Sequence, residues 1–161
     1  MTMGAGRYMA LETVISIIAN TVLVTAVGIL VFGQKQTVSV WAPGGVEFDI
    51  LLQTSTVAFF SSLVPGLLTR WRIRRGKVGR GGAPLVRLPS SLFLQSLLIA
   101  LIAIVLVVPG ATALIEWQAK ASLPLVPFLA FKMILTVIAS AVATPIGLSA
   151  ILAKAPEVSV P

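Results

Sequence analysis

The chain has 161 residues, of which 57% are hydrophobic and 11% are charged, and its formal net charge is +7. A soluble domain carries about 25% charged residues because its surface faces water, so this composition excludes an ordinary soluble domain and indicates that lipid is the solvent. The sequence contains no Cys and no His, which excludes disulfides, metal or haem sites built on these side chains, and catalysis by a cysteine nucleophile or a histidine base.

The first predicted element is an apolar span from about Leu11 to Phe32. It is long enough to cross a hydrocarbon core of about 30 Å at about 1.5 Å per residue. Arg7 precedes the span, as a basic residue precedes the core of a signal peptide. The apolar stretch is longer than such a core, however, and no Ala-x-Ala cleavage site precedes Gln34. We therefore predict an uncleaved transmembrane helix.

A polar stripe runs along this first helix. Asn20 is the amide near its middle, and Ser16 and Thr13 lie four and seven residues before it, on the same face. A buried amide in lipid needs a partner, so we expect this face to pack against other helices, with pore lining as the alternative. Glu12 lies at the amino-terminal end of the span close to Arg7. We expect it to stabilise the helix start there, with proton coupling as the alternative.

The second predicted span runs from about Phe48 to Thr69 and ends at Arg70-Trp71-Arg72, a cationic and aromatic boundary suited to the headgroup interface. A basic loop over residues 70–89 follows. Anchoring of this loop on the cytoplasmic side is the favoured interpretation, and contact with anionic lipid headgroups is the alternative. The candidate lipid contacts are Arg70, Arg72, Arg74, Arg75, Lys77 and Arg80.

Residues 92–115 form the third predicted span, which follows two serines that favour a helix start. Pro109-Gly110 either kinks this helix or ends it early. Leu, Ile and Val dominate the span, so we expect it to be the helix most exposed to lipid or to a partner. The fourth span begins at the prolines at 124 and 127 and reaches about Ala153.

Lysines and arginines outside the spans are distributed asymmetrically. Nine lie on one side, at the two chain ends and in the basic loop, against two, Lys35 and Lys120, on the other. The positive-inside rule therefore predicts that both termini and the loop are cytoplasmic. The expected location is the bacterial cytoplasmic (inner) membrane. This distribution explains the positive net charge without a nucleic-acid partner.

The second and fourth spans share a residue pattern at an offset of 80 positions. The pattern suggests two tandem helical hairpins, residues 1–80 and 81–161, related by an axis along the membrane normal, as in the parallel repeats of transporters. Chance alignment of apolar segments is the alternative. The matched pairs are Phe48 and Phe128, Thr56 and Thr136, Val57 and Val137, Pro65 and Pro145, and Leu68 and Leu148.

Lys132 is a charge within the fourth span, ~9 Å from the midplane on the outer side. Its stem could carry the ammonium outward to the headgroups, or it could pair with Asp49 at the outer end of the second span. The axial mismatch of ~5 Å is within reach of a lysine if the second and fourth helices pack together. Gln53, on the same helix as Asp49, joins these two and Asn20 as a candidate intramembrane polar residue.

These features predict an all-α integral membrane protein, a single domain of four transmembrane helices over residues 1–161. The carboxylates are scattered between the two membrane faces, so we expect neither an enzyme nor a cofactor. We predict a small accessory or interaction subunit of a membrane assembly, in contact with the lipid bilayer and with other membrane proteins or a second copy. The alternative is a small oligomeric channel or transporter with a polar path near Asn20, Gln53 and Lys132.

Overall fold

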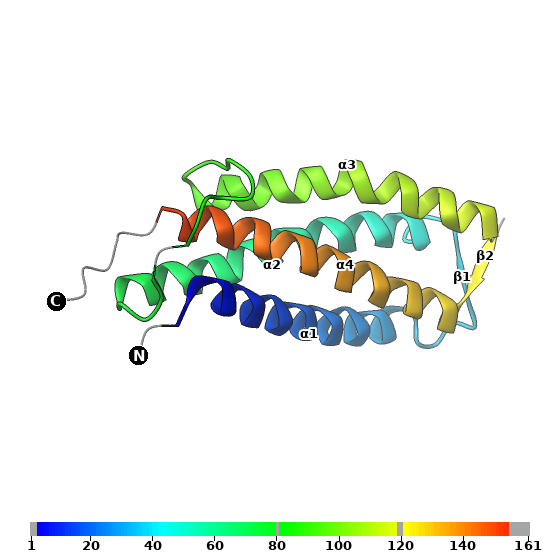
Figure 1. Ribbon diagram of the computed structural model, residues 1–161. Coiled ribbons are helices and arrows are strands. Elements are labelled where there is room, and N and C mark those ends of the chain that lie inside the picture. Colours follow the sequence, from blue (N-terminus) through cyan, green and yellow to red (C-terminus); the bar gives the residue numbers. More distant parts are fainter. Residues whose placement is uncertain (1–2, 80, 119–120, 155–161) are drawn as a thin grey trace.

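The computed structural model describes residues 3–79, 81–118 and 121–154. Within these residues, four long helices run up and down in an elongated bundle (Figure 1). All four are long and apolar enough to cross a membrane. The predicted all-α bundle of four candidate spans is confirmed. The helices are α1 (Ala5–Phe32), α2 (Val46–Arg74), α3 (Leu92–Gln118) and α4 (Leu125–Leu152).

The helices extend beyond the predicted spans, most clearly where the basic loop was expected to begin. Helix α2 continues to Arg74, so Arg70-Trp71-Arg72 lies in its last turns and not in the loop. Cations near a helix carboxyl end are stabilised by the helix dipole, which favours this extension. Helix α3 continues through Pro109 to Gln118. Just after the proline, the Thr112 hydroxyl donates to the Pro109 carbonyl at 3.0 Å.

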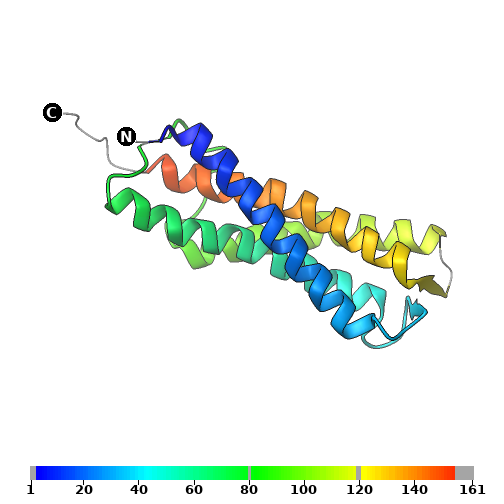
Figure 2. The same cartoon turned by 90° about the horizontal axis from the view of Figure 1, so that it is seen from below.

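Helices α2 and α4 pack against each other in the centre of the bundle. Helix α1 packs on α4 and α3 packs on α2, whereas the helices of each sequential hairpin, α1 with α2 and α3 with α4, touch little (Figures 1 and 2). Helix α2 is the least apolar span, and half of its most hydrophobic window is buried. Five of its polar side chains are buried against protein, namely Gln53, Thr54, Ser61, Ser62 and Thr69.

The prediction that the third helix is the most exposed is wrong. The most hydrophobic window of α1 is 11% buried, against 22% for that of α3. The reason is positional, because α1 packs closely on one neighbour, α4, and meets α2 mainly through a few polar side chains, so most of its remaining surface faces outward. This exposure leaves room for a groove beside α1.

The loops that join α1 to α2 and α3 to α4 meet at the end of the bundle opposite the basic loop (Figure 1). Strands β1 (Thr37–Ser39) and β2 (Ser122–Pro124) pair antiparallel, with Val38 opposite Leu123. We call this the sheet end, and the opposite end, where residues 75–91 connect α2 to α3, the basic end. The rings of Phe32 and Phe128 pack edge to face beneath the strands, with centroids 5.2 Å apart. The strands and the rings tie the two hairpins together.

The proposed duplication stays a prediction. Members of the offset-80 pairs occupy different environments, because Phe128 and Thr136 are buried while Phe48 and Thr56 are exposed. The helix contacts nevertheless follow the symmetry expected of two repeats. If the hairpin α1–α2 exchanges places with the hairpin α3–α4, the contact of α1 with α4 becomes the contact of α3 with α2, and both contacts are extensive.

Close approach of α2, α3 and α4 depends on Gly147. A Cβ atom placed there would lie 2.5 Å from the Ser62 hydroxyl oxygen and 3.3 Å from the Gln95 amide nitrogen, which donates to the Gly147 carbonyl at 2.8 Å. Small residues at such positions let transmembrane helices pack backbone to backbone.

Gly147→Leu is therefore expected to destabilise the bundle by about 1–3 kcal/mol through overpacking. The matched control is Gly110→Leu in α3, where nothing lies within 4 Å of an added Cβ. Unfolding in mixed SDS micelles measures both. Equal stability of the two variants would contradict the close packing at Gly147.

Candidate functional site

Intramembrane polar side chains form three clusters along the bundle. Each joins α1 or α4 to α2. The sheet-end cluster comprises Asp49, Gln53, Lys132 and Thr136. The central cluster comprises Ser16, Asn20, Ser61, Ser140 and Thr144. The basic-end cluster comprises Tyr8, Glu12, Thr69 and Arg72.

In the sheet-end cluster, the structure brings Lys132 and Asp49 together. The ammonium nitrogen of Lys132 lies 2.5 Å from the Asp49 carboxylate, and their side chains are 3% and 17% exposed. The ammonium also lies 5.5 and 5.3 Å from the ring centroids of Phe32 and Phe128, within cation–π range. Lys132 is thus enclosed by protein and does not reach outward to the headgroups.

Gln53 links this ion pair to the α4 backbone. Its amide nitrogen donates to the Lys132 carbonyl at 2.8 Å and to the Thr136 hydroxyl at 2.9 Å. The residue is 8% exposed, yet its amide oxygen has no hydrogen-bond partner within the described part of the chain. An unsatisfied buried acceptor costs about 1–3 kcal/mol. Gln53 is therefore the polar side chain here that a further donor would stabilise.

Asn20 is the hub of the central cluster. Its amide nitrogen lies 3.2 Å from the Ser16 hydroxyl, 2.9 Å from that of Ser61 and 3.1 Å from that of Ser140. Ser140 is fully buried, and Thr144 donates to Ser16 at 3.0 Å. These bonds connect α1, α2 and α4 through direct contacts between side chains, as expected for a packing role.

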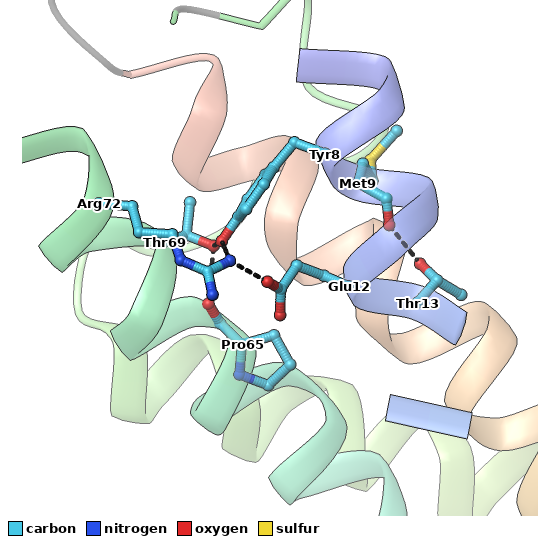
Figure 3. A network of polar contacts seen from close by, with 7 residues as sticks. All are labelled: Tyr8, Met9, Glu12, Thr13, Pro65, Thr69 and Arg72. Atoms are coloured by element: carbon cyan, nitrogen blue, oxygen red, sulfur yellow. Dashed lines mark hydrogen bonds and ion pairs between the residues drawn. The ribbon is translucent and has the colours of Figure 1, made fainter. Parts of the chain in front are cut away.

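The basic-end cluster centres on an ion pair between Glu12 and Arg72 (Figure 3). Arg72 also donates to the Tyr8 hydroxyl at 3.2 Å, and its guanidinium lies 5.3 Å from the centre of that ring. The Tyr8 and Thr69 hydroxyls are 2.9 Å apart. Helix α1 begins at Ala5 and has no acidic residue in its first turn, and the Glu12 side chain is 3% exposed, so the prediction that Glu12 stabilises the helix start beside Arg7 is wrong. Its partner lies on another helix, which proximity in sequence could not reveal.

The candidate lipid contacts have different roles. Arg72 is bound internally, and Arg70 donates to the Ser90 carbonyl at 2.7 Å. The Arg75 guanidinium stacks over the Trp71 ring at 3.9 Å, with the Lys77 ammonium 5.9 Å from the same ring. Arg74 is exposed. Arg80 lies outside the described residues.

A groove of about 200 Å³ lies between α1 and α2. Its polar lining contains Thr56 and the four intramembrane candidates named from the sequence, Asn20, Asp49, Gln53 and Lys132. Its apolar lining comes from Leu23, Val24, Val27, Leu52, Val57 and Phe60. The groove is mainly apolar, with polar groups where it meets α4.

These clusters hold the helices together through hydrogen bonds and ion pairs. Among their described side chains, the Gln53 amide oxygen is buried without a partner. Among residues 3–79, 81–118 and 121–154, no group of three or more acidic side chains is placed to hold a metal ion. No protein-family model, curated protein or solved structure matches the chain.

Proposed function

We propose that this membrane protein is a non-enzymatic subunit of a larger membrane assembly, and that it binds a transmembrane helix of a different protein in the groove between α1 and α2. We further propose that the basic end faces the cytoplasm of a bacterial cell, because most lysines and arginines outside the spans gather there.

The single observation that carries the proposal is the unpartnered amide oxygen of Gln53 beside the groove. This oxygen is covered in the isolated chain, so a donor from another helix reaches it only by inserting a side chain into the groove. In lipid, no water is present to satisfy a buried acceptor, so such a donor would be stabilising. The volume favours a helix over a small ligand, because about 200 Å³ is below the ~300–1,000 Å³ of ordinary ligand pockets. A large side chain projecting from a neighbouring helix would fit this space.

A second candidate function, a small oligomeric channel or transporter, has one observation in its favour. Asn20, Asp49, Gln53 and Lys132 line the same groove, which a second copy could cover to enclose a polar path. The donor capacity of Asn20 is already used by three hydroxyls, however, and Ser140 is buried. The hydrogen bonding therefore favours the interaction subunit.

Site-specific photo-crosslinking in cells tests the proposal. A photoreactive phenylalanine analogue at Leu23, which lines the groove, is expected to crosslink one heterologous membrane protein, identified by mass spectrometry. The same analogue at Ile18, an exposed position on α1 outside the groove lining, is the matched control and is expected to give little of that product. Gln53→Leu should reduce the Leu23 crosslink severalfold, because the acceptor is lost.

The alternatives give distinct results. A crosslink from Leu23 to a second copy of the chain would overturn the proposal in favour of the oligomeric channel or transporter. Crosslinks to lipid alone, or equal protein capture from Leu23 and Ile18, would show that the groove does not bind a partner helix.

A further inference from the structure

We propose that a pocket at the basic end binds the phosphate of an anionic lipid headgroup. The pocket has a volume of about 290 Å³ and lies between the carboxyl ends of α2 and α4 and the start of α3. Arg70 and Arg74 from α2, Lys154 after α4, and Ser90 and Gln95 around the start of α3 contribute its polar lining.

Three cations line this pocket. Within the described residues, no carboxylate lies within ion-pair distance of Arg70, Arg74 or Lys154. The contacts of Arg70 and Lys154 are to neutral acceptors: Arg70 donates to the Ser90 carbonyl, and Lys154 lies 3.3 Å from the Leu88 carbonyl. By contrast, the carboxylates of Glu12 and Asp49 neutralise the cations of the basic-end and sheet-end clusters.

Helix dipoles do not neutralise these charges. The carboxyl ends of α2 and α4 contribute about −0.5 elementary charge each, and the amino end of α3 contributes about +0.5. Three full positive charges therefore exceed the local negative charge. The pocket is suited to an anion, and arginine pairs well with the oxygens of a phosphate.

The surroundings favour a lipid over a soluble phosphate. Ile73, Pro89 and Ile151 line the same pocket, so it also offers apolar contacts to the glycerol and acyl part of a lipid. Trp71, on the adjoining turn of α2, is 47% exposed, as is typical of aromatic residues at the headgroup interface. Basic pockets between transmembrane helices bind anionic headgroups by this combination of charge and apolar contact. The proposal does not depend on the partner helix in the α1–α2 groove.

Native mass spectrometry of the full chain in mild detergent tests the assignment, with phosphatidylglycerol, phosphatidylcholine and inorganic phosphate as separate probes. We expect preferential retention of one phosphatidylglycerol molecule. In Arg70→Gln/Lys154→Gln, its affinity should fall about thirtyfold, since a cation near anionic headgroups is worth about 1 kcal/mol and about 1.36 kcal/mol is tenfold. Lys154→Gln alone should lower the affinity for phosphatidylglycerol about fivefold by the same conversion. Because Lys154 is exposed, this single variant serves if the double variant does not fold.

The matched control is Arg75→Gln/Lys77→Gln, which removes the same charge beside Trp71 but outside the pocket. Its affinity for phosphatidylglycerol should stay within about twofold of wild type, since both side chains are exposed to solvent. An equal loss in both double variants would show a diffuse attraction and overturn the pocket. Retention of phosphatidylcholine as strongly as phosphatidylglycerol would overturn the anionic specificity. Displacement of the lipid by millimolar inorganic phosphate would assign the site to a soluble ligand.

Discussion

Lys132→Met is expected to destabilise the protein by about 3–5 kcal/mol, because it leaves the Asp49 carboxylate without its cation in a largely buried position. Methionine keeps much of the stem that packs beside Phe32 and Phe128, so the loss reports mainly on the charge. Unfolding in mixed SDS micelles, followed by circular dichroism, measures it. Lys35→Met is the matched control, because the Lys35 ammonium lies 5.4 Å from the same Phe32 ring but its side chain is exposed. We expect a change of about 0.5 kcal/mol or less there.

The double variant Lys132→Met/Asp49→Leu separates the ion pair from other effects. Each single substitution leaves one uncompensated charge, whereas the double variant leaves none, so it should be more stable than either single variant. Strict additivity of the two losses in this cycle would show that the contact between Lys132 and Asp49 does not contribute to stability.

The sequence was most informative where two helices each carry one charge at similar depth. Asp49 and Lys132 could be matched because the rise of a helix converts residue number into depth, and few other charges lie near the sheet end. Asn20 was similarly predictable, because an amide within an apolar span has to find partners. The hydrogen bonds that Asn20 donates to Ser61 and Ser140 could not be predicted from the sequence, since they depend on which helices are neighbours.

The basic end was less predictable because, among the described residues, it offers several cations for the carboxylate of Glu12. Arg7 is the nearest in sequence to Glu12, but Arg72 meets it across the bundle once α2 extends to Arg74. The three-residue strands were also missed, because such short segments carry no detectable periodicity. The groove beside Gln53 could not be predicted from the sequence. It exists because α1 and α2 make few contacts with each other, although one loop joins them.

The basic-end ion pair should respond asymmetrically to removal of its two partners. Arg72→Met is expected to cost about 3–5 kcal/mol, because it leaves the Glu12 carboxylate, 3% exposed, without a cation. Glu12→Gln is expected to cost less, about 1–2 kcal/mol, because the Arg72 side chain is 32% exposed and keeps its contact with Tyr8. The difference arises from solvation, since the guanidinium can turn toward the headgroups whereas the carboxylate cannot.

Arg75→Met is the control for loss of an arginine from the same segment, because Arg75 stacks on Trp71 and its side chain is exposed. Its cost should not exceed about 1 kcal/mol, the upper range of an exposed cation–π contact. Denaturation of all three variants in the same mixed micelles gives the order directly. A greater loss for Glu12→Gln than for Arg72→Met would place the buried charge on the arginine and contradict the arrangement in Figure 3. Equal losses for Arg72→Met and Arg75→Met would mean that Glu12 does not depend on Arg72 for its neutralisation.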